Sequence, residues 1–398
     1  HFGQILCVRL GDRPMFVMSG WLAPTLSKQD LVEFGNYRYR PAPLTPFDSY
    51  LGKWCNLVVE FLPRWLAPNL VTVLGIAPLW VLTVILLISH QTPQERPPQW
   101  FFFAFGVCVV YYVIMDNLDG KQARRTGSSS PLGQLCDHGL DATTILPYTA
   151  IVVAMITVRD DPHQRILTFA FQVAGHLGGF LAHWQEHYTG EFPTGFGWIG
   201  VVEASLSFAG LGFLFGSFDT VALQNLMATR VSRFGFELQL QHLATAFFVV
   251  AGFALCLSSL CVVASSALKT RQLGAAVSDL APILILLTSS FMWSDECHVS
   301  VGISLKLLVA SLSLLYTLPM TIASMARRDF PKRQPTLLLY LALVVMSRLL
   351  PVHQVAWIVR VAAVYIIGGL SIWIYVVSRQ ITTHLGINMF TITPKTAA

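Results

Sequence analysis

Residues 113–146 read VIMDNLDGKQARRTGSSSPLGQLCDHGLDATTIL, a stretch that joins two apolar segments and is chemically unlike the rest of the chain. Its carboxylates form two pairs, one at the end of the first segment and one at the start of the second: Asp116 with Asp119, and Asp137 with Asp141. Spacings of three and four residues put each pair on one face of a helix. Ser130 followed by Pro131 is typical of a helix start. The sequence therefore predicts two consecutive helices whose carboxylate pairs face each other across a short basic turn.

The composition assigns the chain to the membrane. Of its 398 residues, 54% are hydrophobic and only 12% are charged, and the mean hydropathy is +0.59. Soluble proteins carry about twice that share of charged residues. This excludes a soluble enzyme, a disordered chain and a nucleic-acid binder with a basic stripe. The formal charge of +5 is better explained as a bias that sets the orientation in the membrane.

We predict an all-α polytopic membrane protein with about ten transmembrane helices, because a bilayer core needs about 20 apolar residues per helix. The apolar segments are 69–89, 100–118, 133–158, 166–183, 198–217, 242–264, 273–293, 301–324, 336–350 and 354–377. The ninth is the shortest, and the connector 218–241 has room for a short interfacial helix.

Three parts of the chain are expected to differ in role. Residues 1–65 are predicted to be a cytosolic or interfacial segment, since aromatic and cationic side chains alternate there as in a helix that lies in the headgroup layer. An ordinary folded lead-in is the other reading of this part. Residues 66–217 are expected to hold the catalytic helices, and 218–398 to add further spans. With the N-terminus in the cytosol, the cytosolic loops carry more Lys and Arg than the opposite loops, so the basic turn would face the cytosol.

Four carboxylates near membrane depth repel one another and need a counter-charge. Hard divalent cations provide it, and oxygen ligands favour Mg²⁺, Mn²⁺ or Ca²⁺ over zinc. Two such ions suit a displacement at phosphorus. The alternative is a structural network of ion pairs with Lys121, Arg124 and Arg125.

Small residues and an arginine lie close to the aspartates in the sequence. Gly120, Ala123 and Gly133 leave room for a ligand to approach the backbone, although close helix packing would also explain them. The guanidinium of Arg124 has the planar fork that suits a phosphate group. Marking the cytosolic side is the simpler explanation for Lys121 and Arg125.

The pattern resembles the signature of the CDP-alcohol phosphotransferase family. Asp116 precedes the string Asp119-Gly120-x2-Ala123-Arg124-x8-Gly133-x3-Asp137-x3-Asp141, which agrees at every fixed position, and the flanking DGKQARRT, SSPLG and DHG look like the eukaryotic choline/ethanolamine branch. Weaker similarities are Trp65-Leu66-Ala67-Pro68-Asn69 with Thr72, and His183-Trp184-Gln185 with Tyr188 and Gly190.

The resemblance implies a reaction and its participants. Members transfer a phospho-alcohol from a CDP-alcohol to a lipid hydroxyl and release CMP. In this branch CDP-choline or CDP-ethanolamine is the donor and diacylglycerol the acceptor, in endoplasmic reticulum or Golgi membranes with the site facing the cytosol. The resemblance is also compatible with a homodimer. By similarity, the four aspartates would hold two Mg²⁺ or Mn²⁺ ions, and Gly120, Ala123, Arg124, Gly133 and Asn69 would line the donor site.

The base that takes the proton of the acceptor hydroxyl has two candidates. His138 has an ordinary pKa of about 6.5, which suits a base near neutral pH. Asp141 would serve instead if it is free of metal. Gln134, four residues before His138, stands where the branch usually has Glu, and it could orient the imidazole. Glu203 is a candidate for holding the headgroup amine, or for a hydrogen bond between helices.

Two other functions share some of these features. A secondary transporter would explain the spans and buried charges, but no second copy of the acidic pattern occurs in the later half. A phosphatidylinositol- or phosphatidylglycerophosphate-type synthase shares the signature, but usually has about six spans. The residues do not separate choline from ethanolamine.

Overall fold

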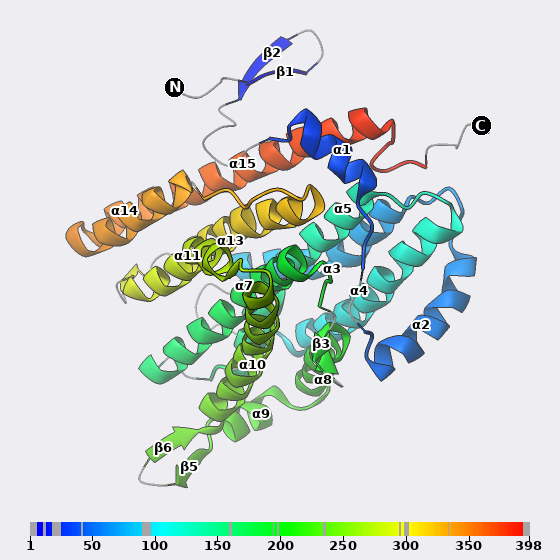
Figure 1. Cartoon of the computed structure of the whole chain (residues 1–398). Coiled ribbons are helices and arrows are strands. Elements are labelled where there is room, and N and C mark those ends of the chain that lie inside the picture. Colours follow the sequence, from blue (N-terminus) through cyan, green and yellow to red (C-terminus); the bar gives the residue numbers. More distant parts are fainter. Residues whose placement is uncertain are drawn as a thin grey trace. The chain divides into compact units, whose positions relative to one another are not determined.

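The computed structural model describes residues 6–10, 13–17, 25–40, 43–89, 97–158, 161–193, 195–196, 199–233, 236–293, 296–297, 302–332 and 334–392. They divide into two compact units, and Figure 1 gives the order of their elements. The unit with the acidic stretch, which we call the signature unit, comprises the described parts of 39–185, 191–262 and 388–398. The second unit comprises the described parts of 1–38, 186–190 and 263–387.

The signature unit is built from helices, with two very short hairpins. Its helices are α2 (Pro46–Val58), η2 (Val59–Phe61), α3 (Pro68–Ser89), α4 (Gln99–Arg125), α5 (Pro131–Asp141), η3 (Ala142–Thr144), α6 (Ile145–Ile156), α7 (Pro162–Thr189), α8 (Val201–Ser217), α9 (Thr220–Met227) and α10 (Leu240–Lys269). The last turn of α7 and the last residues of α10 belong to the second unit. The hairpins pair β3 (Gly195–Phe196) with β4 (Ile199–Gly200), and β5 (Arg230–Arg233) with β6 (Phe236–Gln239).

The second unit also consists mainly of helices. These are α1 (Lys28–Asn36), α11 (Leu273–Ser289), η4 (Ser290–Met292), α13 (Gly302–Met325), α14 (Pro335–Leu349) and α15 (Val352–Leu385). Strands β1 (Leu6–Leu10) and β2 (Arg13–Val17) form an antiparallel hairpin. Helix α1 is tied into this unit by Arg328, whose Nη1 donates to Asp30 Oδ2 at 2.7 Å.

The all-α membrane fold is confirmed, and each of the ten predicted segments coincides with an apolar helix in the described chain. Among the described residues, eight helical stretches are long and apolar enough to cross a bilayer: Pro68–Ser89, Gln99–Arg125, Pro131–Ile156, Pro162–Thr189, Leu240–Lys269, Leu273–Met292, Gly302–Met325 and Val352–Leu385. Helices α8 and α14 have only 17 and 15 residues. At 1.5 Å per residue they extend about 25 and 22 Å, short of a bilayer core of about 30 Å.

Helix α2 has the exposed apolar face that the N-terminal aromatic residues predict. Large hydrophobic side chains are exposed along α2, η2 and the turn that follows: Tyr50, Trp54, Leu57, Phe61 and Trp65. In a protein with membrane spans on the same chain, such a face fits a helix in the headgroup layer. The described part of the connector 218–241 contains a short helix, α9, and its place at the membrane interface stays a prediction.

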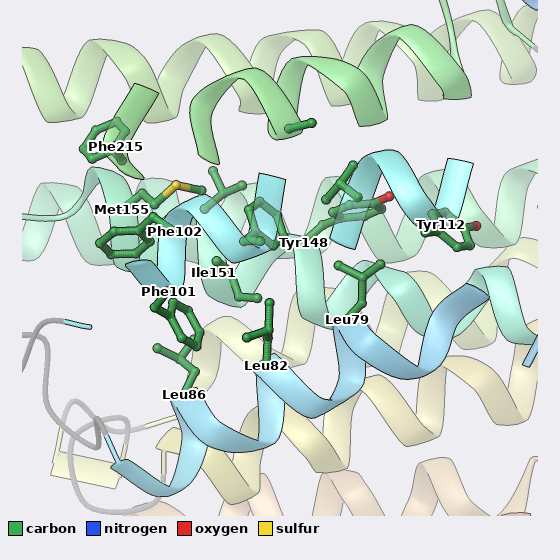
Figure 2. Packing of buried hydrophobic residues seen from close by; sticks show 14 of the residues in the cluster. Leu79, Leu82, Leu86, Phe101, Phe102, Tyr112, Tyr148, Ile151, Met155 and Phe215 are labelled. Carbon is green, nitrogen blue, oxygen red and sulfur yellow. The ribbon is translucent and has the colours of Figure 1, made fainter. Parts of the chain in front are cut away.

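The core of the signature unit lies between α3, α4, α6 and α8 (Figure 2). Helix α3 contributes Leu79, Leu82 and Leu86, and α4 contributes Phe101, Phe102 and Tyr112. Tyr148, Ile151 and Met155 of α6 and Phe215 of α8 complete the labelled set. This packing fixes the part of α4 before Asp116 against α3 and α6.

Helices α4 and α8 pack with their backbones in contact. A Cβ atom placed on Gly212 would lie 2.7 Å from the backbone nitrogen of Gly106 and 2.8 Å from the carbonyl oxygen of Phe102. Small residues allow such close approach between membrane helices. The position of α4, which carries the first two aspartates, therefore depends on glycine in α8.

Gly212→Ala should destabilise the protein, because the atoms that the new methyl group meets are backbone atoms that cannot rotate away. We expect a loss of about 1–3 kcal/mol, the usual range for overpacking, measured as a lower Tm in detergent. Gly210→Ala on the same helix is the matched control, since a Cβ there meets nothing within 4 Å. Equal Tm values for the two variants would contradict the close contact between α4 and α8.

Candidate active site

The acidic side chains come together at the end of α4 and along α5. One carboxylate oxygen each from Asp116, Asp119 and Asp137 lies within 4.8 Å of the others. Asp141 is one turn further along α5, and the Asp116 carboxyl is within hydrogen-bonding reach of Asp137 and Asp141. Asp119 is buried, with 6% of its surface exposed, and the other three are half-buried. The predicted approach of the two pairs is confirmed.

The cluster has the chemistry of a cation site. Asp137 Oδ1 is buried and has no hydrogen-bond partner among the described residues. An unpaired buried carboxylate oxygen is costly, and its neighbours here are two more carboxylates. Oxygen ligands of this kind fit Mg²⁺ or Mn²⁺. The residues present therefore fit the divalent ions that the family resemblance implies.

The nearby cations do not neutralise the cluster. In the part of the chain that the structure describes, no Lys or Arg side chain forms an ion pair with any of the four aspartates. Arg125 instead donates to the carbonyl oxygens of Val59 and Leu62, at 2.9 and 2.8 Å. Its Nε lies 3.2 Å from Glu60. The alternative of a structural ion-pair network is thus not what these side chains form.

The residue between the acidic and basic positions also holds the chain before α3. Gln122 is fully buried, and its Nε2 donates to the carbonyl oxygens of Pro63 and Leu66 at 2.9 and 3.0 Å. Together with Arg125, this amide fixes the connection between α2 and α3. The sequence predicted a topological role for Arg125, and the structure adds this structural role.

Arg124 differs from its neighbour, because its side chain is exposed. Its guanidinium lies beside Gly120, where an added Cβ would be 3.5 Å from Nη1. A guanidinium on an exposed helix end is free to meet a phosphate group. Ala123, the third small residue of the signature, is half-buried on α4.

Two hydroxyl groups orient two of the carboxylates. Thr72 Oγ1 of α3 donates to Asp119 Oδ2 at 2.6 Å, and Tyr112 OH donates to Asp141 Oδ1 at 2.6 Å. Thr72 and Tyr112 are both buried. Sequence reasoning missed Tyr112, although it precedes Asp116 by four residues and so shares its helix face. Each hydroxyl leaves the second oxygen of its carboxylate for another partner.

His138 is buried among aromatic side chains. Its ring stacks on Phe192 with centroids 4.1 Å apart, and it lies 5.4 Å from His183 and 5.5 Å from Tyr39. Its Nε2 is 2.5 Å from the Gln134 side-chain amide, so the predicted contact is present. Its Nδ1 is buried with no partner among the described residues. Phe192 and Tyr39 were not predicted, since nothing in their local sequence marks them.

Glu203 does not present a free carboxylate. Its Oε1 accepts from Thr45 Oγ1 at 2.5 Å, and its Oε2 accepts from the backbone N–H of Gly200 at 2.8 Å. It therefore holds the start of α8 against the start of α2. Burial, together with the nearby Glu203 carboxylate, raises the pKa of Asp48 on α2. Of the two predicted roles for Glu203, the hydrogen bond between segments is the one observed.

Asn69 and Gly133 lie side by side at the starts of α3 and α5. A Cβ on Gly133 would be 3.5 Å from Asn69 Oδ1. The Asn69 amide nitrogen donates to the carbonyl oxygen of Met389 at 2.8 Å. Two of the predicted donor-site residues, Asn69 and Gly133, are thus neighbours.

Comparison with known sequences gives this arrangement a family. Residues 65–295 match the CDP-alcohol phosphatidyltransferase family, to which the chain belongs. The protein is therefore a multi-pass membrane enzyme of phospholipid synthesis.

Individual relatives extend the similarity beyond that region. Cholinephosphotransferase 1 of Danio rerio is 27% identical over 382 residues, which cover 93% of this chain and 96% of that protein. Cholinephosphotransferase 1 of Bos taurus is 34% identical over 198 residues, 50% of this chain and 47% of that protein, so this match spans about half of the relative. "Uncharacterized CDP-alcohol phosphatidyltransferase class-I family protein 2" of Dictyostelium discoideum is 26% identical over 376 residues, 92% of this chain and 88% of that protein.

Removing one charge from the cluster should weaken metal binding without unfolding the protein. Asp119→Asn keeps the shape of the side chain and an oxygen for the Thr72 hydroxyl. We expect the affinity for Mn²⁺, measured by electron paramagnetic resonance in the absence of substrate, to fall by about tenfold or more. The variant should also lose turnover. EDTA should abolish the turnover of the unmutated protein, and added Mg²⁺ or Mn²⁺ should restore it there but should not rescue the variant.

The apo form of this variant should be no less stable than the unmutated protein, because a repulsive charge is gone. Glu237→Gln, at an exposed acidic residue in β6, is the control and should leave Mn²⁺ binding unchanged. An unaltered Mn²⁺ affinity in Asp119→Asn would show that the cluster is not the metal site.

Proposed function

We propose that the protein transfers phosphocholine or phosphoethanolamine from CDP-choline or CDP-ethanolamine to diacylglycerol. The products are CMP and phosphatidylcholine or phosphatidylethanolamine. The observation that carries this proposal is the meeting of three carboxylates within 4.8 Å, one with a buried unpaired oxygen, on the two helices that hold the family signature. Relatives named cholinephosphotransferase support this branch over synthases that use CDP-diacylglycerol.

Asp116, Asp119, Asp137 and Asp141 would hold two divalent ions against the diphosphate of the donor. When bound, such ions neutralise the charge that develops on the phosphoryl oxygens and the leaving group. The hydroxyls of Thr72 and Tyr112 act before any substrate arrives, since they fix the orientation of two of the carboxylates. Preorganised ligands do not have to rearrange during the reaction.

Arg124 is assigned to the donor phosphates, because its exposed guanidinium lies on the same helix end as the aspartates. Gly120 lies beside this guanidinium, and Gly133 lies next to Asn69. The division of the chain into residues 1–65, 66–217 and 218–398 remains our prediction for its functional parts.

His138 is the better candidate for the general base. Its Nε2 faces the Gln134 amide, so Nδ1 is the ring atom available for the acceptor hydroxyl. The Gln134 atom that faces His138 Nε2 is the amide nitrogen, which donates. For Nδ1 to carry the lone pair, His138 Nε2 must keep its hydrogen, so the Gln134 amide has to turn and present Oε1 as the acceptor. The orientation of an amide is fixed by such hydrogen bonds. Gln134 would thus be a positioning residue that selects the reactive tautomer.

The alternative base is less available. One oxygen of Asp141 accepts the Tyr112 hydroxyl, and the other lies in the carboxylate cluster near Asp116. In the proposed step, the hydroxyl proton of diacylglycerol passes to His138 Nδ1 as the oxygen bonds to phosphorus. The bond from that phosphorus to the bridging oxygen of CMP breaks, and CMP leaves.

The acceptor and product are lipids, so we propose lateral entry from the bilayer in the endoplasmic reticulum or Golgi, with the site facing the cytosol. The decisive experiment uses purified protein in detergent with diacylglycerol and Mg²⁺. CDP-choline and CDP-ethanolamine compete in the same assay, and CMP release is measured. A failure to release CMP from either donor would overturn the proposed reaction. Turnover of CDP-diacylglycerol with inositol or glycerol phosphate would instead identify a synthase that uses CDP-diacylglycerol as its donor.

Arg124→Lys should impair the enzyme although it keeps the positive charge. Lysine offers a point charge in place of the planar fork that binds two phosphate oxygens. We expect the KM for the CDP-alcohol to rise and the KM for diacylglycerol to stay near its original value in steady-state assays. Arg125→Lys is an informative comparison, because it should lower stability through the lost carbonyl contacts. An unchanged donor KM in Arg124→Lys would leave that residue with a topological role only.

His138→Ala should lower kcat by roughly 10²–10⁴-fold, the usual contribution of a general base. Donor binding should survive, since His138 is not among the proposed metal ligands. In the unmutated protein kcat should fall as the pH drops and the imidazole gains a proton, and this acid limb should be absent from His138→Ala. Gln134→Ala should cost less, and it should add little in the double variant with His138→Ala.

The opposite assignment has a distinct outcome. A nearly active His138→Ala, combined with an Asp141→Asn variant that binds donor but is inactive, would transfer the role to Asp141. Losses that multiply fully in the double variant would mean that Gln134 and His138 act independently.

A further inference from the structure

The C-terminal tail, residues 388–392, contacts the start of α3, which is far away in sequence. The carbonyl oxygen of Met389 accepts a hydrogen bond of 2.8 Å from the amide of Asn69, a residue 320 positions earlier. These tail residues belong to the signature unit, whereas α15 directly before them belongs to the second unit. The described tail thus contacts Asn69, one of the proposed donor-site residues.

A defined turn separates the tail from α15. Gly386 ends the helix with φ of +63°, in the left-handed region that glycine adopts without strain. The N–H of Ile387 then donates to the carbonyl oxygen of Thr382 at 3.1 Å. This is the usual geometry of a helix stop at glycine.

The tail fixes which way the Asn69 amide faces. A side-chain amide has a donor end and an acceptor end of nearly equal size, and its partners decide the orientation. Met389 offers a carbonyl oxygen, which can only accept, so the NH₂ group of Asn69 must face it. The acceptor, Oδ1, then lies against Gly133, at 3.5 Å from the position of an added Cβ.

Asn69 is almost fully buried, with 8% of its surface exposed, so its amide has few other ways to satisfy its donors. One turn later on α3, Thr72 holds Asp119. The orientation of Asn69 is thus set at the same helix start that positions a proposed metal ligand.

We propose that residues 388–392 complete the donor-binding site. The Met389 carbonyl holds Asn69 with Oδ1 directed to the wall shared with Gly133, where Oδ1 accepts a hydrogen bond from a hydroxyl or amino group of the nucleoside. Without the tail, the buried NH₂ group of Asn69 loses its acceptor, so Oδ1 is no longer held toward the nucleoside. This assignment rests on the proposed use of a CDP-alcohol, and it makes Met389 a positioning residue through its backbone.

The test compares two truncations of the full chain in the CMP-release assay. A chain that stops after Ile387 lacks the whole tail, and a chain that stops after Ile392 keeps it and is the matched control. We expect the donor KM of the shorter chain to rise by about three- to tenfold, the effect of one lost hydrogen bond, with the diacylglycerol KM unchanged. The control should behave as the unmutated protein.

A double-variant cycle separates positioning from a general structural effect. If the tail acts through Asn69, then Asn69→Ala should raise the donor KM by a similar factor, and removing the tail as well should add little. Two glycines inserted after Ile387 displace the Met389 carbonyl without shortening the tail, and should reproduce the truncation even if the truncated chain does not fold. An unchanged donor KM in the insertion variant, equal rises for donor and acceptor, or fully multiplicative effects would each overturn the proposal.

A binding measurement tests the role of the tail without relying on turnover. The dissociation constant for CMP, measured by calorimetry on the same variants, should follow the donor KM. If neither CDP-alcohol is turned over, the proposed function fails, while a weaker CMP affinity in the insertion variant would still support the tail as part of a nucleotide site. CMP affinity that is equal in all variants would remove the tail from that site.

Discussion

The mutual repulsion of four carboxylates between two neighbouring helices is the constraint on which the rest of the signature unit depends. Bringing ionised Asp116, Asp119 and Asp137 within 4.8 Å is unfavourable without a bound cation, and no basic side chain in the described chain forms an ion pair with them. The helices must therefore be held together by other forces. The hydrophobic packing of α3, α4, α6 and α8 and the backbone contact at Gly212 provide them. Packing thus offsets the repulsion between the carboxylates, and a bound cation would relieve it.

Adjacent residues of the signature have separate tasks. Gln122 and Arg125 bind backbone carbonyl oxygens of the segment before α3, and Arg124 between them is exposed. A helix makes this division possible, because consecutive residues point about 100° apart. One side of α4 thus holds the segment that leads to Asn69 and Thr72, while another side carries the exposed Arg124. Charge alone does not distinguish these residues; their neighbours do.

The hydrogen bonds around the carboxylates and the imidazole have a common form. Each catalytic candidate has one atom fixed by a neutral donor or amide and one atom left for substrate or metal: Asp119 with Thr72, Asp141 with Tyr112, and His138 with Gln134. Such partners fix tautomer and orientation without adding net charge to a site that is already crowded with it. The tail at Met389 would do the same for Asn69 on the nucleotide side.

The sequence by itself determined the membrane class, the helical segments and the acidic cluster. These depend on local composition and on the spacing of residues within two consecutive helices, and a short turn between them leaves little freedom for the pairs to separate. The contact between Gln134 and His138 was predictable for the same reason, since both lie on one turn of α5.

Only the tertiary structure decided which groups from distant segments contact the predicted site residues. The rings of Phe192 and Tyr39 contact His138, the Thr45 hydroxyl donates to Glu203, and the Met389 carbonyl accepts from Asn69. The lengths of α8 and α14, which fall short of full spans, were also not fixed by apolar composition. Contacts between distant segments depend on how whole helices pack, and no periodicity within one segment encodes the identity of its neighbour.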